Sequence, residues 1–446
     1  MAIPKICGIE TEYAIIQPNV GEQNPIHAST VLVNAYAKQA EVSPNSGVAY
    51  TVEWDFNDET PGNDARGLAP IGSLPPLVET HLVNAVLENG ARFYVDHAHP
   101  EISTPECIDA LQVVKYDRSG EKILEKAMTL ANEVLPPDEE VIVYKDNSDG
   151  KGNSYGCHEN YLVDRSTPFG DIICHATTHF ITRQIFTGSG KIGVEATGID
   201  SNSIKYQLSQ RADFFEEEVG LETTLKRPII NTRDEPHADA TKYRRLHVIC
   251  GDANMSETAT FLKVGSSSIL LAMIEDDFLS KRIIFDNPVR TIKEVSHDLS
   301  LKKHLILNDG STITALEAQW EILNSASTYV SRGGGEFTGG EVAHEIITTW
   351  ERILTGLEND PESLRLEIDW IAKRLLIESF AERHDLSWFD PRVRLLALQY
   401  HDVREGKRIS DIIGLKKIIP DNDVVEGIDN PPHETRAYFR GMCLQK

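Results

Sequence analysis

Near the N-terminus, Glu10 and Glu12 alternate with apolar residues in the run KICGIETEYAII. A period of two is typical of a β-strand, and it places both carboxylates on the same face of that strand. Two like charges on one face of an otherwise apolar strand are costly to bury unless a cation neutralises them. The pattern therefore predicts a strand whose polar face binds a cation.

Further strand patterns follow in the first 265 residues. GARFYVD ends at Asp96, and SYGCHENYLV places His158 and Asn160 on one face. RLHVIC and TATFLKVG complete the expected strands. Because most of the strands come before most of the helices, we expect an α+β fold and not alternating βαβ units.

Two long segments have the pattern of helices. LPPLVETHLVNAVLENG ends with Gly90, a plausible C-cap, and DPESLRLEIDWIAKRLLIESFAERH begins with Asp360 as N-cap and Pro361 at the first helical position. Between them, VSRGGGEFTGGEV (330–342) is expected to be a linker or a mobile surface loop. A chain of 446 residues exceeds one typical domain. We expect a large domain over residues 1–383 and a small C-terminal domain over residues 384–446.

Composition excludes several classes of protein. The formal charge of −25 opposes nucleic-acid binding, and no apolar run is long enough to span a membrane. Six cysteines are scattered without a CxxC pair, and the N-terminus lacks a secretory pattern, so we expect a cytoplasmic protein with reduced thiols. The basic segment Lys226–Arg245 is either an ordinary solvated face or a local site for phosphate or an acidic peptide.

Two motifs that suggest known sites fail on inspection. GSGKIG (188–193) has Ile192 where a P-loop needs Ser or Thr, so a strand and turn are expected there. His175 and His179 in HATTH lack the glutamate of a zinc-protease helix, which favours a structural pair. The remaining polar cluster combines Glu10, Glu12, Glu101 and His158, a ligand set that suits Mg²⁺ bound to nucleotide phosphates.

Several long segments resemble one known family, the deamidase/depupylase of the prokaryotic ubiquitin-like protein, Pup. The resemblance covers nearly the whole chain, and its relatives are carboxylate–amine ligases of glutamine synthetase type. It implies a curved antiparallel sheet that cradles a nucleotide, helices behind that sheet and a small C-terminal domain. The segments that carry it are GIETEY, GARFYVDHAHPEISTPE, YKDNSDGKGNSYGCHENYL, QLSQRADFFEEEVGLETTLKRPIINTRDEPHADATKYRRLHVICGDANMSE and NPPHETRAYFRG.

The resemblance also implies a reaction. The family hydrolyses the side-chain amide of Pup's C-terminal glutamine and the isopeptide bond between Pup and a substrate lysine. ATP, or ADP plus phosphate, serves as a bound cofactor together with Mg²⁺. The implied partners are Pup, pupylated proteins and, functionally, the bacterial proteasome with its ATPase.

Matched residue by residue, the resemblance implies a role for each site position. Asp96 matches the catalytic aspartate, acting as nucleophile or as base for water or a phosphate. Glu10, Tyr94 and Glu101 match the Mg²⁺ ligands, and Glu12 and His158 are expected to join them. The nucleotide or the scissile carbonyl is expected to contact Arg92, Thr104, Arg211, Arg233 and His247.

Three functions remain open from the sequence. The first is the hydrolase, and the second is the Pup ligase of the same fold. An insertion over about residues 40–76, containing the Tyr50–Pro76 segment with Trp54 and Phe56, and the run DHAHPE favour the hydrolase. The third is a non-catalytic Pup-binding adaptor, against which the intact Asp96 argues.

Overall fold

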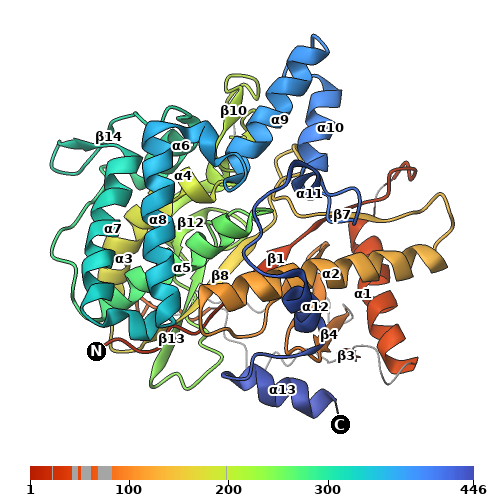
Figure 1. The fold of residues 1–446 in the computed structure, drawn as a ribbon, viewed down its shortest axis with the longest axis horizontal. Coiled ribbons are helices and arrows are strands. Elements are labelled where there is room, and N and C mark those ends of the chain that lie inside the picture. The colour runs from red at the N-terminus through yellow and green to blue at the C-terminus, as the bar shows by residue number, and fades with distance from the viewer. Residues whose placement is uncertain (23, 43–48, 52–61, 69–82, 197, 446) are drawn as a thin grey trace.

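A seven-stranded antiparallel sheet forms the centre of the part of the chain that is described (Figure 1). The structure is a computed structural model, and it describes residues 1–446 except 23, 43–48, 52–61, 69–82, 197 and 446. Trp54, Phe56 and most of the expected insertion lie outside the described residues. In spatial order the strands are β13 (Tyr243–Val248), β8 (Cys157–Asp164), β1 (Cys7–Glu12), β6 (His99–Ser103), β5 (Arg92–Asp96), β4 (Asn84–Leu87) and β3 (Ala49–Thr51).

Helices pack on one face of this sheet. Helices α1 (Pro25–Val42), α2 (Ala110–Val134) and α5 (Glu257–Glu275) contact its strands. Apolar side chains at alternate strand positions, including Ile9 and Tyr161, are buried on this side. Because successive side chains point to opposite faces, the polar residues between them lie on the other face of the sheet.

The strand register aligns the polar residues of four strands. Glu12 lies opposite Glu101 in the β1–β6 pair, and Glu10 lies opposite His158 in the β1–β8 pair. Glu101 in turn lies opposite Tyr94 in the β5–β6 pair. The predicted common face for Glu10 and Glu12 is therefore confirmed, as is the α+β class.

The remaining elements complete the body around the sheet. Figure 1 shows α7 and α8 side by side at one end and α12 against α2 at the other. Within the described residues, no helix is long and apolar enough to cross a membrane. The other helices are α3 (Phe169–Thr182), α4 (Gln184–Thr187), α6 (Pro288–His297), α7 (Ala315–Ser331), α8 (Glu341–Asn359), α9 (Asp369–Arg383), α10 (Pro391–Gln399), α11 (Ile409–Ile413), α12 (Asp421–Asp429) and α13 (Arg436–Leu444), with 3₁₀ turns at Ala212–Phe214, Gly334–Thr338 and Pro361–Leu364. Strand pairs outside the main sheet are β2 (Ala14–Ile16) with β7 (Ile142–Tyr144), β9 (Lys191–Ile192) with β10 (Tyr206–Gln207), β11 (Phe215–Gly220) with β12 (Arg227–Asn231), and β14 (Leu305–Ile306) with β15 (Thr312–Ile313).

The expected strand TATFLKVG is wrong, because these residues lie inside α5. Ser256 caps that helix by accepting a hydrogen bond from the backbone N–H of Ala259. This helix is buried on all sides. A short apolar sequence with β-branched residues is compatible with either a buried strand or a buried helix, so the pattern alone does not distinguish them.

The expected helix ending at Gly90 is also wrong over its described part. Residues 84–87 form strand β4, and residues 74–82 lie outside the described part of the chain. Gly90 has a φ of +80°, and its N–H donates to the carbonyl of Leu87 in the turn that joins β4 to β5. The glycine thus closes a hairpin and not a helix, two uses of the same left-handed conformation.

The long helix expected from Asp360 is interrupted. A 3₁₀ turn over Pro361–Leu364 precedes α9, which begins at Asp369. The buried Asp369 carboxylate accepts hydrogen bonds from Ser256 N, Asn254 Nδ2 and Tyr400 Oη. These long-range bonds place Asp369 at a helix start that helix propensity alone does not indicate.

The glycine-rich segment 330–342 is not a linker. It contains the 3₁₀ turn Gly334–Thr338, which contacts α5, α7 and α8. Gly334 and Gly335 are buried, and a Cβ at Gly334 would lie 2.3 Å from the Tyr329 ring. The glycines therefore allow close packing against neighbouring helices.

Candidate active site on the carboxylate-bearing face of the sheet

Four carboxylates gather where β1, β6 and β5 lie side by side. One carboxylate oxygen each from Glu12, Asp96 and Glu101 lie within 4.8 Å of one another. Glu10 follows on the same face of β1. Glu101 is 2% exposed and accepts a short hydrogen bond from the Tyr94 hydroxyl, which also lies 3.2 Å from Ser103 Oγ.

The carboxylates of this cluster differ in the direction in which their pKa values shift. Burial raises the pKa of Glu101 well above its usual range, and the charges of Asp96, Glu12 and Glu10 raise it further. For Glu12, burial also acts upward, but the hydrogen bond from His99 and the charge of His158 bring the pKa down to about 2. A divalent cation would relieve the repulsion that Glu101 experiences.

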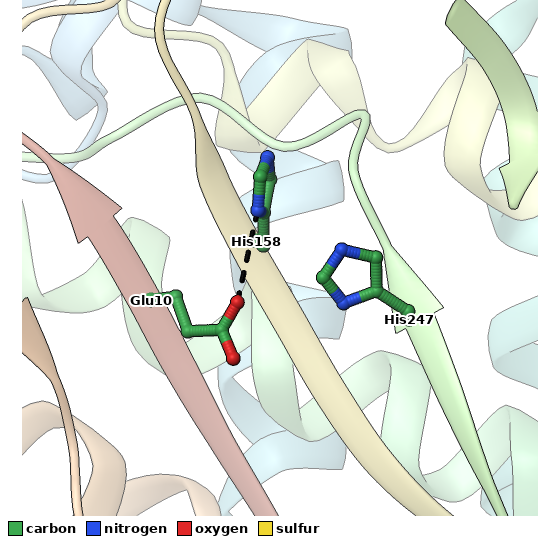
Figure 2. Close-up of side chains that lie close together, drawn as sticks. All are labelled: Glu10, His158 and His247. Carbon is green, nitrogen blue, oxygen red and sulfur yellow. Dashed lines mark ion pairs between the residues drawn. The ribbon is translucent and has the colours of Figure 1, made fainter. Parts of the chain in front are cut away.

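A second group of possible ligands lies on the same face of the sheet, between β1 and the neighbouring strands β8 and β13 (Figure 2). Glu10, His158 and His247 come from β1, β8 and β13, and one ligand atom of each lies within 4.8 Å of the others. His158 Nδ1 is 3.7 Å from Glu10 Oε2, and Arg245 Nη1 is 3.9 Å from Glu10 Oε1. Burial and the nearby Arg245 charge lower the pKa of His247 well below its usual value, so this ring is neutral. A neutral imidazole can act as a metal ligand.

Asp96 lies at the tip of the β5–β6 hairpin, at the edge of the carboxylate cluster. Its side chain is 38% exposed, whereas Glu101 is buried. His97 Nδ1 lies 2.9 Å from Asp96 Oδ1. His99, which faces Asp96 in the strand register, lies 3.5 Å from Glu12 Oε2 and packs on the Tyr155 ring. Asp96 is therefore the carboxylate of the cluster that a substrate can reach.

Arg211 and Arg92 approach this cluster. Arg211 is 1% exposed, and its Nε and Nη1 atoms have no hydrogen-bond partner among the described residues. Burial lowers the pKa of Arg211, although the Glu12 charge opposes that effect. Arg92 lies over the Tyr94 ring at 4.5 Å from its centroid and donates to Asn84 Oδ1 at 2.6 Å. A buried guanidinium with two unused donors suits an anionic ligand.

Arg233 and Thr104 lie at the edges of the site. Arg233 Nε is 3.8 Å from Glu235 Oε2, and the same carboxylate oxygen is 3.8 Å from Arg245. The Thr104 hydroxyl accepts a hydrogen bond from the backbone N–H of Ile9 at 3.1 Å. Thr104 thus contacts the backbone of β1.

The sequence does not single out His99 and Gly156 as site residues, and it indicates Arg245 only as part of the basic segment Lys226–Arg245. Arg245 could have been found, because it lies two residues before His247 on the same strand. A Cβ at Gly156 would lie 2.3 Å from His158 Nε2 and 2.8 Å from Glu12 Oε1. Only a glycine leaves room there for both side chains.

The basic segment Lys226–Arg245 does not form one exposed surface. Arg244 is 7% exposed, donates to the carbonyl of Thr167 and lies over the Phe169 ring. Arg245 lies beside Glu10 on the opposite face of β13. The alternation of the strand therefore separates the two arginines.

Comparison with known proteins assigns this architecture to a family. The model of the family described as Pup-ligase protein matches residues 5–446. A depupylase of Acidothermus cellulolyticus is 46% identical, and a Pup deamidase/depupylase of Mycolicibacterium smegmatis is 44% identical. Both alignments cover 99% of this chain and 88% of the relative.

Solved structures of related proteins agree. The crystal structure of the complex between prokaryotic ubiquitin-like protein Pup and its ligase PafA matches with a TM-score of 0.81 and 32% identity, covering 99% of this chain and 82% of that one. The structure of the Pup ligase PafA in complex with ADP matches with a TM-score of 0.74 and 37% identity, covering 81% and 80% of the two chains. The chain belongs to the Pup-ligase protein family.

Proposed function

We propose that the protein is a Pup deamidase and depupylase. It hydrolyses the side-chain amide of Pup's C-terminal glutamine and the isopeptide bond that joins Pup to a lysine. The observation that carries this proposal is the 44–46% identity to depupylases over 99% of the chain, against 40–41% identity to Pup–protein ligases over 80–81% of the chain. Both reactions break a carbon–nitrogen bond at the same δ-carbonyl of the same residue, so one site serves both.

Asp96 is the residue that we assign to the chemistry. Its carboxylate is accessible to solvent. The neighbouring polar side chains contact one another: the Tyr94 hydroxyl donates to Glu101, and His99 Nδ1 lies 3.5 Å from Glu12 Oε2. Amides are poor electrophiles, so the reaction needs an activated nucleophile, a polarised carbonyl and a protonated leaving nitrogen. Asp96 supplies the first, either by attacking the carbonyl carbon or by deprotonating a water or phosphate that attacks it.

We further propose that the carboxylate face holds Mg²⁺ and that the adjoining basic residues hold a nucleotide. The residues fit a hard cation: burial and the neighbouring carboxylates raise the pKa of Glu101, and carboxylate oxygens from three strands converge. A bound Mg²⁺ supplies charge neutralisation for phosphates. Arg211, Arg233, Arg92, Thr104 and His247 would contact the nucleotide, and the metal would be held by Glu10, Glu12, Tyr94, Glu101 and His158.

Incubation with Pup substrates tests the activity. With ATP and Mg²⁺, Pup ending in glutamine should gain the mass that accompanies conversion of an amide to an acid, measured by intact mass spectrometry. A Pup–lysine conjugate should release free Pup. Conjugation of Pup ending in glutamate to an acceptor protein, with no cleavage in either assay, would show that the protein is a ligase.

Replacing one metal-binding carboxylate tests the cation site. Glu101→Ala should weaken ATP binding in the presence of Mg²⁺ and abolish turnover together, because the cation ties the phosphates to the protein. Isothermal titration with and without Mg²⁺ measures the first effect independently of activity. Glu336→Ala, in the partly exposed 3₁₀ turn far from this face, is the control. Unchanged Mg²⁺-dependent affinity in the Glu101 variant would remove Glu101 from the metal site.

A further inference from the structure

His97 occupies an unusual place next to the reacting carboxylate. It begins the two-residue turn between β5 and β6, with a φ of +52°. A left-handed conformation is uncommon for a residue with a side chain, and it is maintained here by pairing of the strands on both sides of the turn. The side chain is 68% exposed, and its Nδ1 lies 2.9 Å from Asp96 Oδ1. The hairpin thus holds an imidazole against Asp96 and exposed to solvent.

Amide cleavage at Asp96 requires a proton donor for the departing nitrogen. Both leaving groups, ammonia and the lysine amine, are poor leaving groups as anions, so the nitrogen must be protonated as the bond breaks. Asp96, as nucleophile or base, begins the reaction ionised. The proton must therefore come from another group near Asp96.

The other described acid–base groups nearby are committed elsewhere. The Tyr94 hydroxyl donates to Glu101, and His99 is hydrogen-bonded to Glu12 while its ring packs on Tyr155. His158 and His247 face Glu10 on the far side of β1. Guanidinium groups such as Arg211 do not give up a proton in proteins. Among the described residues, His97 is the acid–base side chain that lies 2.9 Å from Asp96 and is 68% exposed to solvent.

We propose that His97 is the general acid that protonates the leaving nitrogen. This inference rests on the proposed amide hydrolysis. As the carbon–nitrogen bond breaks, its electron pair goes to nitrogen, which takes a proton from the His97 imidazolium. The imidazole stays within reach because its Nδ1 lies 2.9 Å from Asp96 Oδ1, which places the ring beside the carbonyl that Asp96 activates.

The protons balance for either role of Asp96. If Asp96 attacks directly, water then cleaves the acyl–aspartate anhydride, one of its protons restores the His97 imidazolium and the other passes to solvent. If Asp96 deprotonates the attacking water, the proton it gains returns to His97 across the 2.9 Å contact. Each cycle consumes one water and no redox equivalent.

The nature of the leaving group provides the test. His97→Ala and His97→Gln are assayed with the Pup–lysine conjugate and with Pup that carries a γ-p-nitroanilide on its C-terminal glutamate. Nitroaniline departs with little need of a proton, so loss of a general acid should slow the lysine conjugate by about 10²-fold or more and the anilide far less. Added imidazole should restore part of the rate of His97→Ala on the lysine conjugate. His304→Ala, at an exposed position remote from the sheet, is the control.

Each remaining outcome decides the matter. Equal slowing of both substrates, with no response to imidazole, would show that His97 only maintains the hairpin. Wild-type rates on the lysine conjugate would also overturn the proposal. Titration of ATP binding to each variant separates these outcomes from misfolding. A wild-type protein that cleaves neither substrate would overturn the proposed function itself.

Discussion

At the scale of single residues, the site depends on unequal exposure among like groups. Glu101 and Asp96 contribute to the same cluster, yet Glu101 is buried with a raised pKa and Asp96 is accessible at the hairpin tip. The buried carboxylate suits a permanently bound cation, and the exposed one suits a reacting group. Glu101 lies within β6 and Asp96 at the end of β5, and this difference in position accounts for their difference in exposure.

Replacing Asp96 tests that division. Asp96→Asn should reduce both deamidation and depupylation by about 10²-fold or more, because the amide can neither attack nor accept the proton. Binding of ATP with Mg²⁺ should stay within a few-fold of the wild type, since the other three carboxylates remain. Rates come from mass spectrometry and affinities from calorimetry. Turnover of the variant at the wild-type rate would place the chemistry on another residue.

The residues of the site were predictable from the sequence where the strand period determines their direction. Glu10, Glu12 and His158 share a face because strand positions alternate, and the structure brings them together. Arg244 shows the limit of such reasoning. It belongs to a basic segment by composition, but its position on β13 directs it into the interior. Charge density along a sequence does not determine which charges share a surface.

At the scale of elements, a few long-range bonds determine which of two plausible structures forms. The segment TATFLKVG is helical because it lies in α5, which Ser256 caps and which is buried behind the sheet. The helix expected over residues 360–384 is interrupted because the Asp369 carboxylate accepts hydrogen bonds from Ser256 and Tyr400. The C-terminal helix α13 shows the same dependence. Glu106 accepts hydrogen bonds from Arg436 Nε and Arg440 Nη2, each at 2.6 Å, and thereby holds α13 beside the sheet.

This ion pair predicts a pH-dependent contribution to stability. Burial alone acts to raise the pKa of Glu106, but Arg440 and Arg436 lower it to about 2. A carboxylate whose pKa is lowered by folding stabilises the fold above its unfolded pKa of about 4.3 and loses that contribution as pH falls toward the folded value. Glu106→Gln should therefore lower the free energy of unfolding by about 1–3 kcal/mol at pH 7, and the variant should melt at a lower temperature than the wild type.

The difference between the two melting temperatures should shrink as the pH falls from about 4.3 to about 2, because Glu106 has the higher pKa in the unfolded chain and proton binding there favours unfolding. Scanning calorimetry across that range measures it. Glu434→Gln, an exposed neighbour whose carboxylate lies 3.2 Å from Gln112 Nε2, is the control and should match the wild type throughout. A difference for Glu106→Gln that is constant from pH 7 to pH 3 would show that the effect does not come from the charge of Glu106.

At the scale of the whole molecule, a buried ion network joins the sheet region to the C-terminal segment. Lys145, 1% exposed, donates to Asp117 at 2.6 Å and Glu121 at 2.8 Å, and Arg408 lies 2.9 Å from Glu121. The charges of Arg118, Lys145 and Arg408 outweigh burial and lower the pKa of Glu121 to about 2. Glu121 is thus the anion that three buried cations share.

The boundary between residues 1–383 and 384–446 stays a prediction, and this network is where it can be probed. Arg408 belongs to the second part, whereas Lys145 and Glu121 belong to the first. Composition suggested a boundary near His384, but no sequence pattern indicates that Lys145, Glu121 and Arg408 meet, because their contact depends on the packing of α2 against distant segments. Long-range pairing of this kind is the part of the fold that sequence periods do not reveal.

Removing the shared anion should therefore destabilise the whole protein. Glu121→Gln leaves Lys145, Arg118 and Arg408 buried with too little negative charge, and breaking a buried pair in this way costs about 3–5 kcal/mol. Glu426→Gln is the matched control, because it removes the partner of Lys115 on the same helix α2 at a site where Glu426 is 60% exposed. That exposed pair should contribute about 1 kcal/mol or less.

Thermal melting compares the two variants, and limited proteolysis shows where each chain first opens. We expect Glu121→Gln to melt several degrees below Glu426→Gln and to be cleaved first after residue 384. Equal melting temperatures would mean that the network contributes no more than a surface ion pair and does not hold the C-terminal segment to the body.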